Sequence, residues 1–322
     1  MADVQVLHGV SVTETTFIDT TQIDMASIPA ASFTANKFYL ILANQIMHGN
    51  SSSINRRARL VHGTTPTVFD DGALSWEGYN DTGGPQEHEV SWMYFYTQPG
   101  TTELLKIQCS VSATGVTGRN KLSQILAINL DDLGVSGTDY FLNEDLTDYT
   151  MTGTPTAKAV TASFTPNGTD RWLFIGHMIH DVVGVTTPIG CELYDSVAGI
   201  LNSFQNEGED ATEDFKGNNL YWVGVPTNAA RTLAVRPFNS GSAIMLASRV
   251  IAINLSKFAQ SASVFAAAEV DPATDPTYTN VATVSITPTT TGNFVYLAFL
   301  NQDVNETSTN WKTRLQVNPD GG

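Results

Sequence analysis

The sequence is short of charge, and of basic charge in particular. Charged residues make up 15% of the 322 residues, and 16 Lys and Arg stand against 32 Asp and Glu, so the net charge is −16. Globular proteins average about 25% charged residues. Nucleic-acid backbones are polyanions, and a protein that binds them presents a basic face. The charge balance therefore predicts no direct contact with nucleic acid.

Cysteines and long apolar runs are also scarce. Cys109 and Cys191 are the only cysteines, and two lone thiols in so long a chain fit synthesis in a reducing cytosol. The first residues lack a basic segment followed by an apolar one, so they predict no secretory signal. No apolar run approaches the ~18 residues that span a membrane. We therefore expect a protein without a membrane span and without a recognisable export signal.

Threonine and glycine are abundant instead, with 40 Thr and 25 Gly in the chain. Threonine favours strands over helices, and glycine favours tight turns. Hydrophobic residues at 42% and aromatic residues at 9% are sufficient for packed cores. At about 100–200 residues per domain, the length predicts two domains and part of a third.

An internal repeat supports this division. The sequence ILAINL at 125–130 returns as VIAINL at 250–255, and ASFT at 31–34 returns at 162–165. Phe17, Phe141 and Phe265 recur at one constant spacing and are expected to mark the start of each unit. We predict one repeat over residues 1–135, a second over 136–260, and a partial third over 261–322 that is either truncated or completed by another chain.

Each repeat reads as an all-β unit. Short apolar or alternating segments separated by Gly, Pro, Asn and Asp predict an antiparallel β-sandwich, with a jelly roll as the first topology and an immunoglobulin-like Greek key as the alternative. The run ILAINL predicts a central strand that contacts two core layers. Short connectors are expected to hold successive sandwiches close together in an elongated string. The predicted strands of the first repeat lie near 15–18, 29–34, 38–47, 58–62, 66–69, 87–97, 103–112 and 123–130.

Two groups of titratable residues are candidate sites. His177, His180 and Asp181 fall in a predicted strand, where residues three apart point to opposite faces, so a shared metal is disfavoured. Glu87 and Glu89 flank His88 on one strand face and could serve acid–base chemistry, but an exposed strand edge explains them better.

Acidic segments at 70–71, 131–132, 144–145 and 207–214 could supply oxygen ligands for Ca²⁺, but none has the spacing of a known calcium loop, so solvated turns are favoured. No G-x-S-x-G nucleophile motif or glycine-rich nucleotide loop occurs. The prediction is a protein with no catalytic, cofactor or metal residues, with Ca²⁺ kept as a secondary hypothesis.

Two further groups are candidates for ligand or partner contact. Trp76, Tyr79 and Trp311 could stack on sugars, although a sandwich core uses such residues more often. The only basic cluster, formed by Arg56, Arg57 and Arg59, is expected in a loop before a strand. It could contact an anion or a partner, or form a solvated edge that prevents strand pairing.

Repeats that carry SFT near the start and AINL at the end, in an acidic chain rich in Thr and Asn, resemble the tandem β-sandwich structural proteins of tailed bacteriophages. These are capsid decoration proteins, head spikes and tail fibres. The resemblance covers most of the chain and transfers no binding residue. It implies a non-enzymatic, homo-oligomeric virion protein, made in the host cytoplasm and placed on the virion surface. Its expected partners are its own copies, other virion proteins and a host-surface glycan.

Two other functions stay open. A carbohydrate-binding or adhesive module on a cell surface has the same composition, and it would be extracellular. A hydrolase built on a β-scaffold is the third alternative.

Overall fold

The computed structural model describes residues 4–18, 20–49, 55–77, 87–111, 117–182, 189–206, 214–239 and 243–258, together with 261, 283–285 and 287. The chain forms two compact units, Met1–Ala259 and Gln260–Gly322. Of the predicted partial third repeat at 261–322, only residues 261, 283–285 and 287 are among those described. Among the described residues, no helix is long and apolar enough to cross a membrane.

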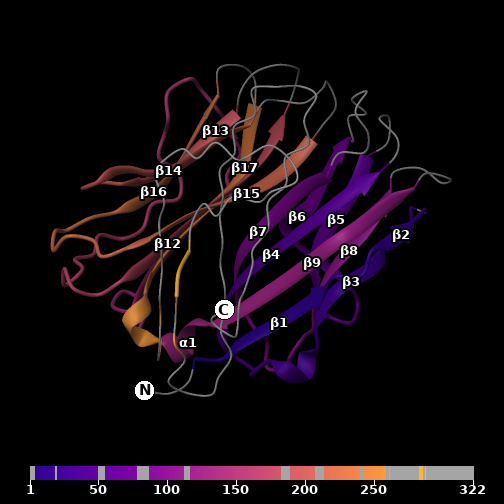
Figure 1. Ribbon diagram of the computed structural model, residues 1–322, viewed down its shortest axis with the longest axis horizontal. Helices are drawn as coiled ribbons and strands as arrows, with labels where there is room; N and C mark the ends of the chain where they lie inside the picture. Colours follow the sequence, from indigo (N-terminus) through magenta and orange to yellow (C-terminus); the bar gives the residue numbers. More distant parts are fainter. Residues whose placement is uncertain are drawn as a thin grey trace. The chain divides into compact units, whose positions relative to one another are not determined.

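The first half of the larger unit forms two antiparallel sheets (Figure 1). One has the strand order β1-β9-β4-β7, with β2 also paired to β9, and the other has the order β6-β5-β8-β3. When β1 and β2 are counted as one interrupted strand, the two orders are 1-8-3-6 and 5-4-7-2, which is the arrangement of a jelly roll. The strands are β1 (Val6–Ser11), β2 (Thr15–Phe17), β3 (Ile23–Ile28), β4 (Phe38–Gly49), β5 (Asn55–His62), β6 (Thr67–Glu77), β7 (Glu87–Thr97), β8 (Leu105–Val111) and β9 (Gly118–Asn129).

The second half repeats this arrangement. One sheet has the order β10-β17-β12-β15, with β11 paired to β17, and the other has the order β14-β13-β16. A bridge between Val160 and Ala234 places a short segment beside β16, where β3 lies beside β8 in the first half. The strands are β10 (Tyr140–Asp145), β11 (Tyr149–Thr150), β12 (Trp172–Val182), β13 (Ile189–Asp195), β14 (Gly199–Asn206), β15 (Asp214–Gly224), β16 (Leu233–Asn239) and β17 (Ala243–Asn254).

The prediction of an all-β fold built from antiparallel sandwiches is confirmed. Four antiparallel sheets form two sandwiches, and within the described residues one pair, Phe215 with Ser75, links a sheet of one to a sheet of the other. The only helical segments among the described residues are the short η1 (Ala30–Ser32), α1 (Leu130–Leu133) and η2 (Leu255–Lys257).

Three hydrophobic cores hold these sheets together. The first is centred in the first sandwich, where it includes Trp92 and Leu60, and it extends to Ile179 of β12 and Ala247 of β17. The second lies inside the second sandwich and includes Phe174 and Leu193. A third core lies between the two sandwiches, where the outer faces of β4, β7 and β9 meet those of β12 and β17. Its members include Leu40, Leu42, Met93, Ile128, Ile175, Ile251 and Ile253.

The third core explains the apolar runs in the sequence. In β17, Val250 belongs to the second core and the neighbouring Ile251 to the third, because successive side chains point to opposite faces of a sheet. In β9, Ile125 belongs to the first core and Ile128 to the third. The prediction that ILAINL contacts two core layers is confirmed. The expected end-to-end string is wrong for these two sandwiches, because their apolar sheet faces pack against each other.

Two details of the predicted repeat are corrected. Phe141 pairs with Ala252 in β10, and the residue in the corresponding place of the first half is Leu7, paired with Ala127. Phe17 lies instead in β2, opposite Gly118, so Phe17 and Phe141 are not equivalent. The two halves differ in loop length, and a constant spacing therefore does not mark equivalent positions.

The predicted strand at 29–34 is also wrong. Residues 30–32 form η1, and the strand in this region is β3, which ends at Ile28, just before Pro29. Proline fixes φ and carries no N–H group, so it suits the start of a helical turn better than a paired strand. Strand β1 was not predicted, because its sequence VLHGVS has no regular alternation of apolar and polar residues.

Candidate binding pocket between the two sandwiches

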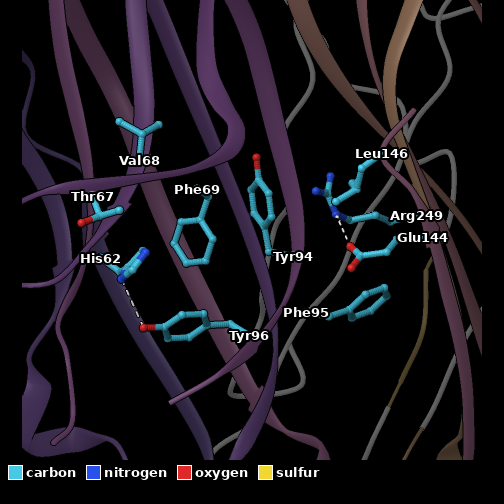
Figure 2. A pocket seen from close by; sticks show the side chains of 10 residues that line it. All are labelled: His62, Thr67, Val68, Phe69, Tyr94, Phe95, Tyr96, Glu144, Leu146 and Arg249. Carbon is cyan, nitrogen blue, oxygen red and sulfur yellow. Dashed lines mark hydrogen bonds and ion pairs between the residues drawn. The ribbon is translucent and has the colours of Figure 1, made fainter. Parts of the chain in front are cut away.

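A pocket with a volume of about 280 Å³ lies where the first sandwich meets the second. Strands β5, β6 and β7 line it from the first sandwich, and β10 and β17 line it from the second (Figure 2). The lining residues are His62, Thr67, Val68, Phe69, Tyr94, Phe95, Tyr96, Glu144, Leu146 and Arg249.

An aromatic cluster forms the side of the pocket that belongs to the first sandwich. The Phe69 ring lies between three others, with centroid distances of 4.7 Å to Tyr94, 4.9 Å to His62 and 5.1 Å to Tyr96. The Phe69 side chain is buried, and the contacts to His62 and Tyr96 are edge-on. Such contacts fix ring orientation, so this side of the pocket is preformed.

Hydrogen bonds hold the His62 ring in place. The Nδ1 atom of His62 lies 2.6 Å from Oε2 of Glu103, and the Tyr96 hydroxyl donates to the same oxygen at 2.7 Å. These two hydrogen bonds lower the pKa of Glu103, and the one from His62 has the larger effect. The carboxylate of Glu103 is therefore ionised. Burial and the neighbouring Glu103 raise the pKa of Tyr96. Because an ionised carboxylate only accepts, Nδ1 of His62 donates the hydrogen bond to Glu103.

Arg249 of β17 forms the opposite side of the pocket. Its side chain is 1% exposed, and its Nε donates to Oε2 of Glu144 at 3.2 Å. The guanidinium carbon lies 4.3 Å from the centroid of the Tyr94 ring, a cation–π contact that joins the two sandwiches. The Nη1 atom is buried and has no hydrogen-bond partner among the described residues. A buried donor in this state favours any acceptor that can reach it.

The pocket therefore combines one fixed cation, one partly exposed carboxylate, an oriented imidazole and an apolar lining. The Glu144 side chain is 41% exposed and Leu146 is 42% exposed, so the pocket opens to solvent on this side. Sites for drug-sized ligands have volumes of about 300–1,000 Å³. The volume of this pocket is just below that range.

The basic cluster is not placed as the sequence predicted. Arg56, Arg57 and Arg59 lie within β5, which is an interior strand between β6 and β8, and not in a loop or at a sheet edge. Arg56 is buried, Arg57 is exposed, and Nε of Arg59 donates to Oε1 of Gln108 at 2.9 Å. The alternating apolar residues Ala58 and Leu60 on the same strand point into the first core. None of the three arginines lines the pocket.

The aromatic candidates cannot be placed in the pocket either. Trp76 falls within β6, but its side chain is outside the described residues. Tyr79 and Trp311 lie outside the described residues altogether. Their sugar-stacking role stays a prediction.

The two histidines of β12 point to opposite faces, as their spacing predicts. His177 lies between the sandwiches, where its Cε1 faces Gly217 of β15, and its Nδ1 is 3.0 Å from the carbonyl oxygen of Asn218. His180 lies two residues after Met178, which is a member of the second core. Its side chain is therefore on the face of β12 that points into the second sandwich. Burial is the main cause that lowers both pKa values to about 3, aided by Arg249 at His177 and by Lys216 at His180. Within the described residues, no group of three or more His, Cys, Asp or Glu is placed to hold a metal ion.

The acidic segments have structural contacts where they are described. Asp131 and Asp132 lie in the first turn of α1 and accept hydrogen bonds from the backbone N–H groups of Phe38 and Gln5, respectively. Glu144 and Asp145 belong to strand β10 and not to a turn. The side chains at 70–71 and the segment 207–213 lie outside the described residues.

The candidate acid–base pair lies on β7, an edge strand of its sheet. Glu89 is exposed and accepts a hydrogen bond from Nδ2 of Asn44 at 3.4 Å. The side chains of Glu87 and His88 lie outside the described residues.

The sequence matches no protein-family model and no curated protein. Solved structures with a related arrangement of strands are only distantly similar. They include dimeric latent PorU from Porphyromonas gingivalis, with a TM-score of 0.29 and 10% identity, covering 75% of this chain and 22% of PorU. The chain thus spans less than a quarter of the length of PorU.

Two further structures are tandem or capsid sandwiches. The tandem CBM22 domains of Paenibacillus barcinonensis Xyn10C have a TM-score of 0.23 and 8% identity, covering 78% of this chain and 98% of theirs. The VP2 subviral particle of infectious bursal disease virus has a TM-score of 0.25 and 9% identity, covering 80% of this chain and 73% of VP2. At these scores the likeness extends to β-sandwich architecture and carries no argument about function.

Proposed function

We propose that this protein is a non-enzymatic structural component of a virion, displayed on the outer surface as a capsid decoration, spike or fibre segment. The observation that carries the proposal is the third core between the sandwiches. Flexibly linked modules keep polar faces toward each other. Here two jelly rolls instead share a buried apolar layer, and the result is one rigid block suited to bearing load in an assembly.

The charge supports an outward position. A net charge of −16 is repelled by a packaged nucleic acid, and acidic surfaces keep a densely displayed protein soluble. The same net negative charge disfavours a position in an inner shell that touches the genome.

Contacts between copies are expected at the edge formed by β1 and β2. Among the described residues β1 pairs only with β9, so within this part of the chain one side of its backbone has no neighbouring strand. Val10, Val12 and Ile18 are exposed there, by 51%, 72% and 58%. Unpaired strand edges with exposed apolar side chains favour association with another chain.

The proposal is tested by following the protein in the cells that make it. Lysates are separated on a density gradient, and fractions are analysed by mass spectrometry and immunogold electron microscopy. We expect the protein to sediment with particles and gold to label their outer surface. Recovery only as free protein, or on the cell envelope, would overturn the proposal.

A second measurement tests self-association of the purified chain. Sedimentation velocity should show oligomers whose population falls when Val10 and Val12 are both changed to Lys. The matched control changes Val197 and Ile200 to Lys, which are exposed by 46% and 57% near β14. A monomer at all concentrations, or an equal loss of oligomers in both variants, would exclude the β1 edge as the contact.

A further inference from the structure

The two sandwiches meet through equivalent faces of their sheets. The alignment of ILAINL with VIAINL makes Leu126 of β9 equivalent to Ile251 of β17. Their partners on the adjacent strands are Leu42 of β4 and Ile175 of β12, respectively. All four side chains lie in the third core or pack against it. Within one chain, this sheet face therefore packs against its own counterpart in the other repeat.

A β-bulge at the same place extends the equivalence along the strands. In the first sandwich, the register shifts just after Ile46 of β4, which is paired with Leu122 of β9. In the second sandwich, the register shifts just after Ile179 of β12, which is paired with Ala247 of β17. Side chains an even number of positions apart share a face of a strand. Both pairs therefore continue the sheet face that forms the third core.

The two counterparts differ in how far they are covered. In the second sandwich, Ile179 and Ala247 are fully buried members of the first core, and Arg249 on the same face is 1% exposed. In the first sandwich, Ile46 and Leu122 are only partly buried, and neither belongs to a core within the described part of the chain. The second sandwich therefore covers only part of the face that the first presents to it.

One row of side chains crosses the boundary of the covered area. The row runs over β7, β4, β9 and β1 and consists of Ser91, Asn44, Gln124 and Val10. Ser91 is buried and donates a hydrogen bond to the carbonyl oxygen of Gly217 in the second sandwich. Asn44 is partly buried, Gln124 is exposed, and Val10 is 51% exposed. Coverage by the second sandwich thus fades between β4 and β9, while the sheet face continues.

The open face is the part left over, formed by Val10, Asn44, Ile46, Leu122 and Gln124. It contains no charged residue, although the net charge of the chain is −16. Three aliphatic side chains and two amides offer nothing to attract a charged partner, whereas exposed apolar patches favour contact with another protein. The face is continuous with the third core, and that core shows what its counterpart accepts, which is another sandwich of the same kind.

We propose that two copies of the chain associate through their open faces, first sandwich against first sandwich, in a twofold-symmetric contact. The inference rests on the proposed function in one respect, that copies of the chain associate, and it adds a contact distinct from the β1–β2 edge. Exposed Glu89 lies opposite Ile46 at the rim of the face, and both copies are acidic. Salt screens this repulsion, so it should strengthen the contact.

The first experiment is cross-linking of the full chain carrying Gln124→Cys with a short bismaleimide. Gln124 lies on the middle strand of the three that form the open face, so in a twofold contact it comes close to its own mate. The two native thiols are buried, which leaves the new one to react. We expect covalent dimers whose yield rises with salt. The matched control is Gln205→Cys, exposed on β14, which should stay monomeric. Equal yields from the two variants, or no dimer from Gln124→Cys, would overturn the proposal.

Sedimentation velocity gives an independent measurement. Gln124→Lys places two like charges opposite each other in the contact, and it should weaken association by at least about tenfold. Gln205→Lys changes the net charge equally and should have no effect. Val12→Lys lies beyond the end of β1 and reports on the edge alone. Circular dichroism melts establish that each variant is folded. Loss of oligomers in Val12→Lys but not in Gln124→Lys, or a monomer at every concentration, would exclude the face contact.

The contact test and the particle test fail independently. A chain that dimerises through Gln124 but never sediments with particles keeps this contact and loses the virion role. A virion protein whose association is insensitive to Gln124→Lys keeps its role, and the open face is then not its contact.

Discussion

The side-chain hydroxyl of Ser91 in β7 donates a hydrogen bond to the carbonyl oxygen of Gly217 in β15 at 3.1 Å, which joins the first sandwich to the backbone of the second. A Cβ atom on Gly217 would lie 2.1 Å from the carbonyl oxygen of Ser91. The glycine is thus required by the close approach of two strands. This contact continues the third core at a point where no side chain fits.

The change Gly217→Ala should therefore loosen the junction. Because the obstructing atom belongs to the backbone, the strands must move apart, and we expect a loss of about 1–3 kcal/mol in the free energy of unfolding. Urea denaturation followed by circular dichroism measures it. The matched control is Gly153→Ala, where the nearest atom lies 3.8 Å away, and its stability should change by less than about 0.5 kcal/mol. Equal effects of the two substitutions would show that the strands do not approach as described.

The third core should make the two sandwiches unfold together. Ile251 is fully buried between them, and Ile251→Ala removes packing from both at once. We expect a loss of about 2–5 kcal/mol, with one transition retained. Calorimetry tests this by comparing the calorimetric and van't Hoff enthalpies for Met1–Ala259. Ile200→Ala, on an exposed side chain, serves as control. Two separate transitions in the unmodified protein would contradict a shared core.

The buried histidines should make the fold sensitive to mild acid. His177 and His180 have pKa values lowered to about 3 in the folded protein, mainly by burial, against about 6.5 when unfolded. The unfolded chain therefore binds more protons between about pH 3 and pH 6.5, and stability falls as the pH falls through this window. Each histidine should contribute a loss of about 2 kcal/mol between pH 7 and pH 5.

The pH range of this stability loss distinguishes the two histidines from the carboxylates. Asp24, Glu103, Asp139 and Asp170 have lowered pKa values, so their contribution is lost only below about pH 4. Urea denaturation at pH 7 and pH 5 should show a smaller difference for His177→Asn and for His180→Asn than for the unmodified chain. His8→Asn should keep the full difference, because His8 is exposed. An unchanged difference in both buried-site variants would show that other groups control the acid response.

The sequence predicts the fold well where both faces of a strand are buried. ILAINL and VIAINL are apolar at successive positions because one face serves a sandwich core and the other the shared core. The strand predicted at 87–97 is β7, and its bounds are confirmed. The edge strand β1 is harder to predict, because its sequence does not alternate regularly. The interior position of β5 is also harder to predict, because Arg56 and Arg59 suggest a solvent-facing segment although β5 has a neighbouring strand on each side.

The pocket could not be predicted from the sequence. Its residues come from separate strands of both halves, and they meet only because the sheet faces of the two sandwiches pack together. The sequence marks Glu144 as part of an acidic pair, but it does not indicate the ion pair with Arg249, which lies in an otherwise apolar stretch. A buried charge in such a stretch is a usable signal, since an arginine flanked by core positions requires a partner.

Both thiols should be inert in the folded protein. Cys109 and Cys191 are free and fully buried, each in the core of a different sandwich. Burial raises the pKa of Cys109 to about 12 and raises that of Cys191 as well, so neither forms the thiolate that reacts. We expect no labelling by a disulfide reagent at pH 8 under native conditions and two labelled thiols in 6 M guanidinium. If the sandwiches unfold together, both should become reactive at the same urea concentration, and peptide mapping of partly labelled protein reports on each. Labelling of one cysteine well before the other would show that one sandwich opens alone, which a shared core forbids.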